Sequence, residues 1–305
     1  MTARARLVSF VILGRPHFLA GALVLYASGA AGAYYLGYPL NVSTFAWGLA
    51  CVLATQLMTH YSNDYYDSAA DALNRTPTLW SGGSRVLVRG DLPPEVAQRA
   101  ALAFGLAAAA LGLYLTFGLG TGPLVLPLVG ISMALAWAYS APPLRLHSRG
   151  LGELDAGFVV GVLTPLIGHY LQTGRVSPSA LLAAIHLLPV GFTMILAVQF
   201  PDAIGDALAD KRSLVVRLGG ARAALVHNGA LAAAYLSLVP LTALGLPPAI
   251  ALVTALTLPL AVVQIRSLHR GAWLDPRRFP GLTLRAILII GLTGTAHLVG
   301  YLLSA

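Results

Sequence analysis

The sequence has 305 residues, of which 57% are hydrophobic and 10% are charged, and its mean hydropathy is +0.76. This balance excludes an ordinary soluble domain and indicates a polytopic membrane protein. The net charge of +8 comes without a basic stretch interleaved with aromatic residues, so we expect contacts with membrane lipids and no nucleic-acid binding. The single cysteine, Cys51, excludes a disulfide within one chain.

Apolar runs of about 18 to 25 residues follow one another along the chain, each long enough to cross a bilayer core of roughly 30 Å as a helix. They predict an all-α bundle of nine transmembrane helices, forming a single integral-membrane domain over residues 1–305. The N-terminal run resembles a signal peptide, but Arg15 and Pro16 interrupt it, so we expect it to be retained as the first span. The nine predicted spans are 17–37, 44–62, 95–117, 121–139, 153–173, 179–200, 223–244, 246–268 and 284–304.

The basic residues predict the orientation of these spans, because cytoplasmic loops carry an excess of Lys and Arg. With nine spans and a cytoplasmic N-terminus, only Arg175 of the 19 basic residues falls on the opposite side. All 11 acidic residues fall on the cytoplasmic side as well. We therefore expect a multi-pass protein of the cell inner membrane whose chemistry faces the cytoplasm.

The second predicted span runs into an acidic ladder, Asn63, Asp67 and Asp71, within YSNDYYDSAAD. A spacing of four residues advances a helix by about 400°, so these side chains lie on one face, with Asp64 on its flank. A second ladder follows the sixth span in QFPDAIGDALAD, where the same spacing predicts one shared face for Asp202, Asp206 and Asp210. These clusters stand out in a chain that otherwise avoids carboxylates.

Oxygen ligands in small number suit Mg²⁺, which is usually held by one or two carboxylates together with substrate phosphate oxygens. The predicted cytoplasmic loops also contain the cations that a diphosphate requires, since an arginine fork matches phosphate oxygens. The two ladders therefore indicate a Mg²⁺-dependent diphosphate site. The loop side chains concerned are Arg75, Arg85, Arg89, Tyr139, Ser140, Arg145, Arg149, Lys211 and Arg212.

Several segments resemble the UbiA superfamily of intramembrane prenyltransferases. NDYYDSAAD resembles the first aspartate motif of that superfamily, and QFPDAIGDALADKRSLVVRLG resembles the second. YSAPPLRLHSRGLGELDAGFVVGVLTPLIGHYLQTG is similar to the fourth and fifth spans of the menaquinone-pathway branch, the 1,4-dihydroxy-2-naphthoate polyprenyltransferases. The sequence departs from the pattern at Asp210, where the family usually has glycine, and at His147, where relatives often have lysine.

The resemblance implies helices around a central cavity, two Mg²⁺ ions bound by both motifs, and a polyprenyl diphosphate whose chain lies in an apolar tunnel. The hydroxyl of Tyr139 can donate to the leaving oxygen, and the sequence does not choose between Asp64 and Asp71 as the base that deprotonates the acceptor. The implied metal ligands are Asn63, Asp67, Asp71, Asp202 and Asp206, with Asp64 and Asp210 as supporting ones. The implied diphosphate contacts are Arg15, Arg85, Tyr139, Arg145 and Lys211.

The expected reaction is transfer of the polyprenyl group to a small aromatic quinone precursor, with 1,4-dihydroxy-2-naphthoate as the first choice of acceptor. Other acceptors stay open, namely 4-hydroxybenzoate, a chlorin or haem precursor, and a glycerol-phosphate lipid. A CDP-alcohol phosphotransferase is excluded because its aspartate motif, DxxDGxxAR, does not occur. A cation transporter is the non-enzymatic alternative, although its acids would be expected near the middle of the membrane.

Overall fold

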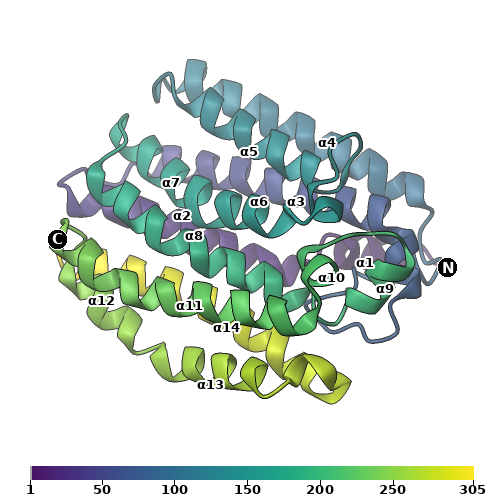
Figure 1. Cartoon of the computed structure of the whole chain (residues 1–305). Helices are drawn as coiled ribbons and strands as arrows, with labels where there is room; N and C mark the ends of the chain where they lie inside the picture. Colours follow the sequence, from purple (N-terminus) through teal and green to yellow (C-terminus); the bar gives the residue numbers. More distant parts are fainter. Residues whose placement is uncertain (1) are drawn as a thin grey trace.

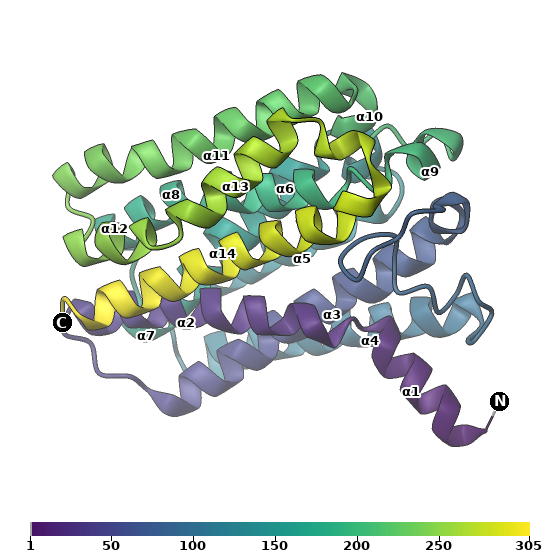
Figure 2. The ribbon, with the colours of Figure 1, turned by 90° about the horizontal axis from the view of Figure 1, so that it is seen from below.

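The computed structural model describes residues 2–305 as a bundle of long helices, and no β-strand occurs in this range. Figure 1 shows the helices running roughly side by side, and Figure 2 shows α1 (Ala3–Leu13) leaving the bundle at an angle. The all-α prediction is confirmed. The main helices are α2 (Leu19–Tyr35), α3 (Val42–Leu73), α4 (Pro94–Leu113), α5 (Val125–Ser140), α6 (Gly152–Phe158), α7 (Thr164–Thr173), α8 (Pro178–Val198), α11 (Gly220–Ala243), α12 (Pro248–Ala255), α13 (Leu258–His269) and α14 (Phe279–Leu302).

Local sequence explains where these helices begin and continue. Asn41 caps α3 by accepting a hydrogen bond from the Thr44 amide at 3.0 Å, and Ser177 caps α8 in the same way through the Ala180 amide at 3.2 Å. One π-helical turn, η2 (Tyr114–Gly118), extends α4, and another, η4 (Val159–Leu163), joins α6 to α7. Each of the nine predicted spans overlaps a helix or a joined pair of helices.

The number of membrane spans stays a prediction. Within residues 2–305, seven helical segments are long and apolar enough to cross a bilayer, and the bent pair α12 and α13 would make an eighth. The pair bends by 54°, because Pro259 lacks the amide that would continue the hydrogen-bond ladder of α12. Helix α5 has 16 residues, which is short for a membrane span.

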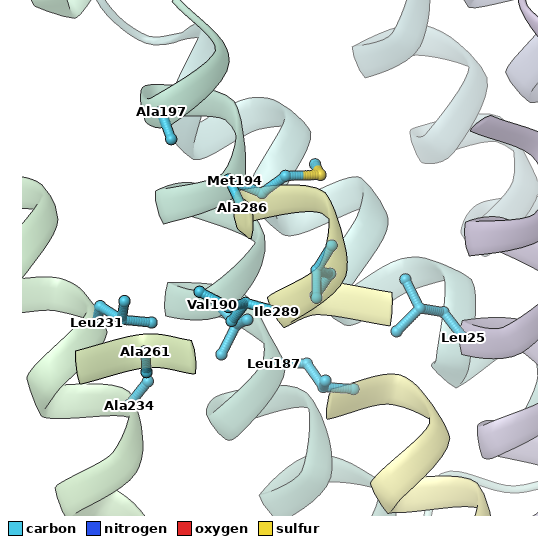
Figure 3. Packing of buried hydrophobic residues seen from close by; sticks show 11 residues of the cluster. Leu25, Leu187, Val190, Met194, Ala197, Leu231, Ala234, Ala261, Ala286 and Ile289 are labelled. Atoms are coloured by element: carbon cyan, nitrogen blue, oxygen red, sulfur yellow. The ribbon is translucent and has the colours of Figure 1, made fainter. Parts of the chain in front are cut away.

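The helices pack through small residues and branched aliphatic side chains, as is usual where lipid removes the drive to bury apolar surface between helices. The cluster in Figure 3 combines residues of α2, α8, α11, α13 and α14, so it joins segments far apart in the sequence. Alanines 197, 234, 261 and 286 belong to this cluster, and they let the helix backbones approach closely. The cluster therefore packs α2, from the N-terminal part of the chain, against four helices of the C-terminal part.

The two ends of the bundle differ in character. The short helices α9 (Ala203–Leu208) and α10 (Leu214–Leu218) lie at the end opposite the C-terminus in Figures 1 and 2, beside the loop of residues 74–93. At the other end, the guanidinium of Arg175 lies over the ring of Tyr38, 5.2 Å from its centroid. The charged end carries both acidic ladders.

Glycine permits the closest crossing in the bundle, between α2 and α7. A Cβ atom at Gly29 would overlap the backbone carbonyl of Pro165, and one at Gly168 would overlap the carbonyl of Tyr26. We expect Gly29→Ala to lower the free energy of unfolding by about 3 kcal/mol, because neither backbone can yield locally. Gly21→Ala on the same helix is the matched control, since its Cβ would enter open space. Chemical unfolding in detergent measures both, and equal stability of the two variants would contradict this packing.

Candidate active site

The first acidic ladder lies on one face of α3, as predicted. The helix continues without a break to Leu73, so Asn63, Asp67 and Asp71 follow one another at single-turn intervals. The Asn63 amide donates to Oδ2 of Asp67 at 2.8 Å and to Oγ of Ser140 at 2.9 Å. Asp67 is 4% exposed, which makes it a buried carboxylate with several partners.

The second ladder differs from its prediction at its last member. Helix α8 ends at Val198, and Asp202 precedes α9, where the Asp206 amide donates to the Asp202 carbonyl at 2.8 Å. Helix α9 then ends at Leu208, before Asp210, whose φ is +51°. The Asp210 side chain is 87% exposed and pairs with Arg212 at 3.2 Å. The prediction of one shared face is therefore wrong for Asp210, because the chain leaves the helix before that residue.

Lys211 joins the two ladders. Its ammonium lies 2.9 Å from Oδ2 of Asp67 on α3 and 3.4 Å from Oδ1 of Asp206 on α9. On the other side of Asp67, Nε2 of the fully buried His147 lies 2.5 Å from Oδ1. Asp206 has a second oxygen, Oδ2, that is buried without a hydrogen-bond partner. The site thus holds more acid than its side-chain cations neutralise.

The pKa values of the second ladder reflect this excess of acid. Burial, together with the nearby Asp206, raises the pKa of Asp202 to about 7. Burial also raises the pKa of Asp206, against the opposing effect of Lys211. Burial alone would lower the pKa of Lys211, but Asp67 and Asp206 outweigh it and hold that pKa above its ordinary value. A further cation between the ladders would relieve the repulsion among the carboxylates.

The loop of residues 74–93 closes over both ladders through hydrogen bonds. Asn74 donates to Oδ1 of Asp202 at 2.7 Å, and the Gly82 amide donates to Oδ2 of the same residue at 3.2 Å. The Ser84 amide and hydroxyl donate to Asp64, and the Arg85 guanidinium donates to the Asp71 carbonyl. The loop is therefore bonded to the second ladder through Asn74 and Gly82, and to α3 beside the first ladder through Ser84 and Arg85.

Glycine is required in this loop at Gly83, where the backbone φ is +72° and a Cβ atom would overlap the Asp71 carboxylate. Four residues other than glycine also have positive φ, which costs of order 1–3 kcal/mol each and is common at functional sites. All four were predicted as site residues from the sequence: they are Arg15, Arg85, Arg145 and Asp210.

Arg15, at the start of the first span, belongs to the same cluster. Its guanidinium pairs with Asp64 and donates to Oδ1 of Asn63 at 3.0 Å. Arg15 and Ser84 both donate hydrogen bonds to the Asp64 carboxylate, which leaves it less free than the Asp71 carboxylate to accept a proton. The side chain of Arg145 is exposed and makes no hydrogen bond or ion pair within residues 2–305, so it lies outside this network.

The first ladder reaches a cavity of about 480 Å³ through Asn63, and the ladder aspartates themselves do not line it. Arg15, Asn63, Tyr139 and Asp155 belong to its charged and polar lining, and the ring of Tyr139 packs on His147 with centroids 5.2 Å apart. The remaining wall is mostly apolar and comes from α2, α3, α5, η4, α7, α8 and α14. The cavity therefore joins a charged mouth to an apolar interior, as the resemblance implied.

Sequence reasoning missed three of these contacts. His147 was noted only as a departure from the family, although it is the closest partner of Asp67. Asn74 lies three residues after Asp71 and could have been read as an extension of the ladder. Asp155 was counted among the acids but given no role, although it lines the cavity. No sequence signal connects His147 with Asp67, because the contact joins residues 80 positions apart.

The donor set fits a divalent cation although no cluster is preassembled. Within residues 2–305, no three His, Cys, Asp or Glu side chains form a group ready to hold a metal ion. The side chains that converge do offer oxygen donors, including the unpartnered Oδ2 of Asp206. Lys211 occupies the space between the ladders, where its ammonium supplies positive charge. Oxygen donors of this kind suit Mg²⁺.

Comparison with known proteins identifies the family. Residues 16–283 match the UbiA prenyltransferase family. The chain belongs to this family. It is therefore a prenyltransferase and a multi-pass membrane protein, and the resemblance seen in its motifs is confirmed.

Three similar proteins are named as naphthoate or naphthoquinone transferases. The chain is 26% identical over 254 residues to the 1,4-dihydroxy-2-naphthoate octaprenyltransferase of Bacillus subtilis, covering 83% of this chain and 80% of the relative. It is 29% identical over 231 residues to the enzyme of the same name from Mycobacterium tuberculosis, covering 75% and 76%. It is 27% identical over 294 residues to the 2-carboxy-1,4-naphthoquinone phytyltransferase of Synechocystis, covering 94% and 91%.

Solved structures share the fold. A UbiA homologue from Archaeoglobus fulgidus, bound to GPP and Mg²⁺, superposes with a TM-score of 0.69 at 16% identity, covering 95% of this chain and 99% of that one. A homologue from Aeropyrum pernix gives a TM-score of 0.67 at 21% identity, covering 91% and 97%. At these identities the likeness establishes the fold.

Removing Lys211 should make the stability of the folded protein depend on a divalent cation. We expect Lys211→Met to lower the free energy of unfolding by about 3 kcal/mol in EDTA, because Asp67 and Asp206 lose a buried counter-charge. Mg²⁺ should then raise the unfolding midpoint of the variant more than that of the unchanged protein. Thermal unfolding in detergent with and without Mg²⁺ measures both effects.

Arg212→Met is the matched control, since Arg212 is the next residue and its side chain is 67% exposed. It should behave like the unchanged protein. If Lys211→Met responded to Mg²⁺ no more strongly than the control, the bridge would have no part in charge compensation.

Proposed function

We propose that the protein transfers a polyprenyl group from a polyprenyl diphosphate to a small aromatic quinone precursor in a Mg²⁺-dependent reaction, with 1,4-dihydroxy-2-naphthoate as the acceptor. The observation that carries this proposal is the meeting of two acidic ladders through Lys211, beside a mostly apolar cavity that Asn63 of the first ladder lines. The naphthoate-directed names of the curated relatives support the choice of acceptor.

The proposed metal ligands are Asn63, Asp67, Asp71, Asp202 and Asp206, which offer oxygen donors from α3 and from the start of α9. Mg²⁺ bound there would neutralise the charge that develops on the departing diphosphate. The chain's own contribution is to hold these donors under the 74–93 loop and to exclude bulk water from the site. We propose that Asp210, which is exposed, takes no part in metal binding.

The diphosphate is proposed to lie beside Arg15, Arg85, Lys211 and the hydroxyl of Tyr139. Arg15 and Tyr139 line the cavity mouth, whereas Arg85 and Lys211 flank it from the loop and the second ladder. Preorganised positive charge of this kind stabilises a leaving diphosphate. Arg145 would have to turn inward from its exposed position to contribute.

Loss of the allylic C–O bond leaves a cation that the cavity can shelter. Its wall is mostly apolar, and the rings of Phe18, Trp80 and Tyr139 can stabilise positive charge. The electron-rich ring of the acceptor then forms the new C–C bond. Asp71 and Asp64 are the proposed candidates for the base that removes the displaced ring proton; Asp64 is already paired with Arg15, and Asp71 could serve only through an oxygen that does not bind the metal.

We also propose that residues 1–305 form one catalytic domain in the cell inner membrane, with the active site facing the cytoplasm. Helices α2, α3, α5, α7, α8 and α14 line one cavity, which argues for a single unit. The basic residues gather at the end of the bundle that holds the ladders, whereas Arg175 lies at the other end. Cytoplasmic loops are the ones that carry such an excess.

The proposed reaction is tested by incubating the purified protein with Mg²⁺, a polyprenyl diphosphate and a panel of acceptors, with the products identified by mass spectrometry. We expect prenylated 1,4-dihydroxy-2-naphthoate, and no product when EDTA replaces Mg²⁺. Preferential reaction with 4-hydroxybenzoate, a chlorin or haem precursor, or a glycerol-phosphate lipid would reassign the acceptor. Failure with every acceptor, together with ion flux in proteoliposomes, would favour a cation transporter.

The second ladder supplies a sharper comparison. We expect Asp206→Asn to reduce kcat/KM by at least about 100-fold, because it removes a charged metal ligand. Asp210→Asn lies four residues away, and it should stay within about two-fold because its side chain points to solvent. Steady-state prenyl transfer at saturating Mg²⁺ measures both variants. Equal losses would return Asp210 to the metal site and contradict the geometry of α9.

A further inference from the structure

Asp155 is a buried acid that the proposed chemistry does not use. It lies in the first turn of α6 and is 7% exposed, and its Oδ1 atom is buried without a hydrogen-bond partner. An unpaired carboxylate at such a place costs stability, and ionisable groups inside membrane helices usually serve a function. Unlike Asp67 or Asp64, Asp155 has no cation in an ion pair within residues 2–305.

The carboxylate lines the cavity close to the reacting end. Gly152, one turn earlier on α6, packs so closely that a Cβ atom there would lie 2.6 Å from Cα of His147 and 3.1 Å from the Tyr139 ring. Residues three apart lie about 60° from each other around a helix, so Asp155 projects from nearly the same side of α6. Asp155 and Tyr139 both line the cavity.

A second buried hydrogen-bond acceptor without a partner lines the same cavity. Gln56 on α3 donates its amide N–H to the Phe18 carbonyl at 3.2 Å, which leaves its Oε1 buried without a partner. Both unsatisfied atoms, Oδ1 of Asp155 and Oε1 of Gln56, are hydrogen-bond acceptors. The third unpartnered atom in the cavity lining, Nε of Arg15, is a donor that belongs to the cluster around Asp64. A ligand that carries hydroxyl groups would supply hydrogen bonds to the two acceptors.

We propose that Asp155 binds the aromatic acceptor by accepting a hydrogen bond from one of its ring hydroxyls, and that it thereby selects hydroxylated arenes. The inference rests on the proposed function, since it names the group that would hold the acceptor of that reaction. A prenyl chain has no hydrogen-bond donor, so Asp155 and Gln56 would serve the acceptor and not the donor's hydrocarbon tail. Rejection of an analogue without the hydroxyl follows, because such a ligand would leave the carboxylate buried and unpaired.

If Asp155 binds the acceptor, replacing it should weaken acceptor binding without lowering the stability of the fold. Asp155→Leu replaces an unpaired buried acid with an apolar side chain of similar size, so the thermal unfolding midpoint should stay equal or rise. The KM for the aromatic acceptor should rise about 10- to 100-fold, the loss typical of a hydrogen bond to a charged group. The KM for the polyprenyl diphosphate should stay within about two-fold. Asp155→Asn keeps an acceptor oxygen and should recover part of the loss.

Competing ligands test the hydroxyl directly. Hydroxynaphthalene and its methyl ether are compared as inhibitors of prenyl transfer by the unchanged protein and by Asp155→Leu. We expect the unchanged protein to prefer the hydroxyl compound by about ten-fold or more, and the variant to prefer it by less than two-fold. Asp91→Asn is the control acid, because Asp91 is paired with Arg89 at 2.8 Å in the 74–93 loop and does not line the cavity. It should match the unchanged protein in every measurement.

Three results would overturn the inference, and they are distinguishable. A lower unfolding midpoint with an unchanged acceptor KM would make Asp155 a structural residue. A fall in kcat at an unchanged acceptor KM, with the hydroxyl preference retained, would place the carboxylate beside the allylic cation instead. If the unchanged protein alkylated no hydroxyarene at all, the proposed function would fail and the inference with it.

Discussion

The buried ion pairs of Lys211 are the interaction on which the rest of the site depends. They join Asp67 on α3 to Asp206 on α9. Lys211 follows Asp67 by 144 positions, so these ion pairs connect distant segments of the chain. Two carboxylate clusters brought together without such a cation would repel each other strongly in a medium of low dielectric constant. The positive charge of one side chain therefore allows the two ladders to share a site.

The buried carboxylates also account for the strained backbone of the loop that covers them. The loop of residues 74–93 closes over the acids with hydrogen bonds from Asn74, Gly82 and Ser84, and it requires positive φ at Gly83 and Arg85. Such conformations persist only where neighbouring contacts compensate for them. Here the compensation is the set of charge-assisted hydrogen bonds to carboxylates that would otherwise be unsatisfied.

The cavity separates two chemical tasks along its length. Its charged mouth can bind and activate a diphosphate, whereas its apolar wall can hold hydrocarbon and exclude water. Asp155 adds an acceptor oxygen to the cavity wall from α6, a helix that carries neither ladder. A site of this design would recognise its two substrates with different residues.

Much of this arrangement could be predicted from sequence because it depends on local periodicity. Apolar length indicated the helices, and the four-residue spacing correctly placed Asn63, Asp67 and Asp71 on one face of α3. The same reasoning failed at Asp210, because the short helix α9 ends at Leu208 and the chain turns outward. Spacing reports a shared face only while the helix continues.

By itself, the sequence determined the membrane class, the all-helical fold and the family, and it singled out the two acidic ladders, since hydropathy, motif spacing and residue type are properties of the chain. Only the tertiary structure decided that Lys211 and His147 compensate Asp67, that Asp210 stays in solvent, and that Asp155 faces the cavity unpaired. The physical reason is that charge compensation and burial depend on distances between separate helices. Those distances are set by side-chain packing across the bundle, which no local pattern encodes.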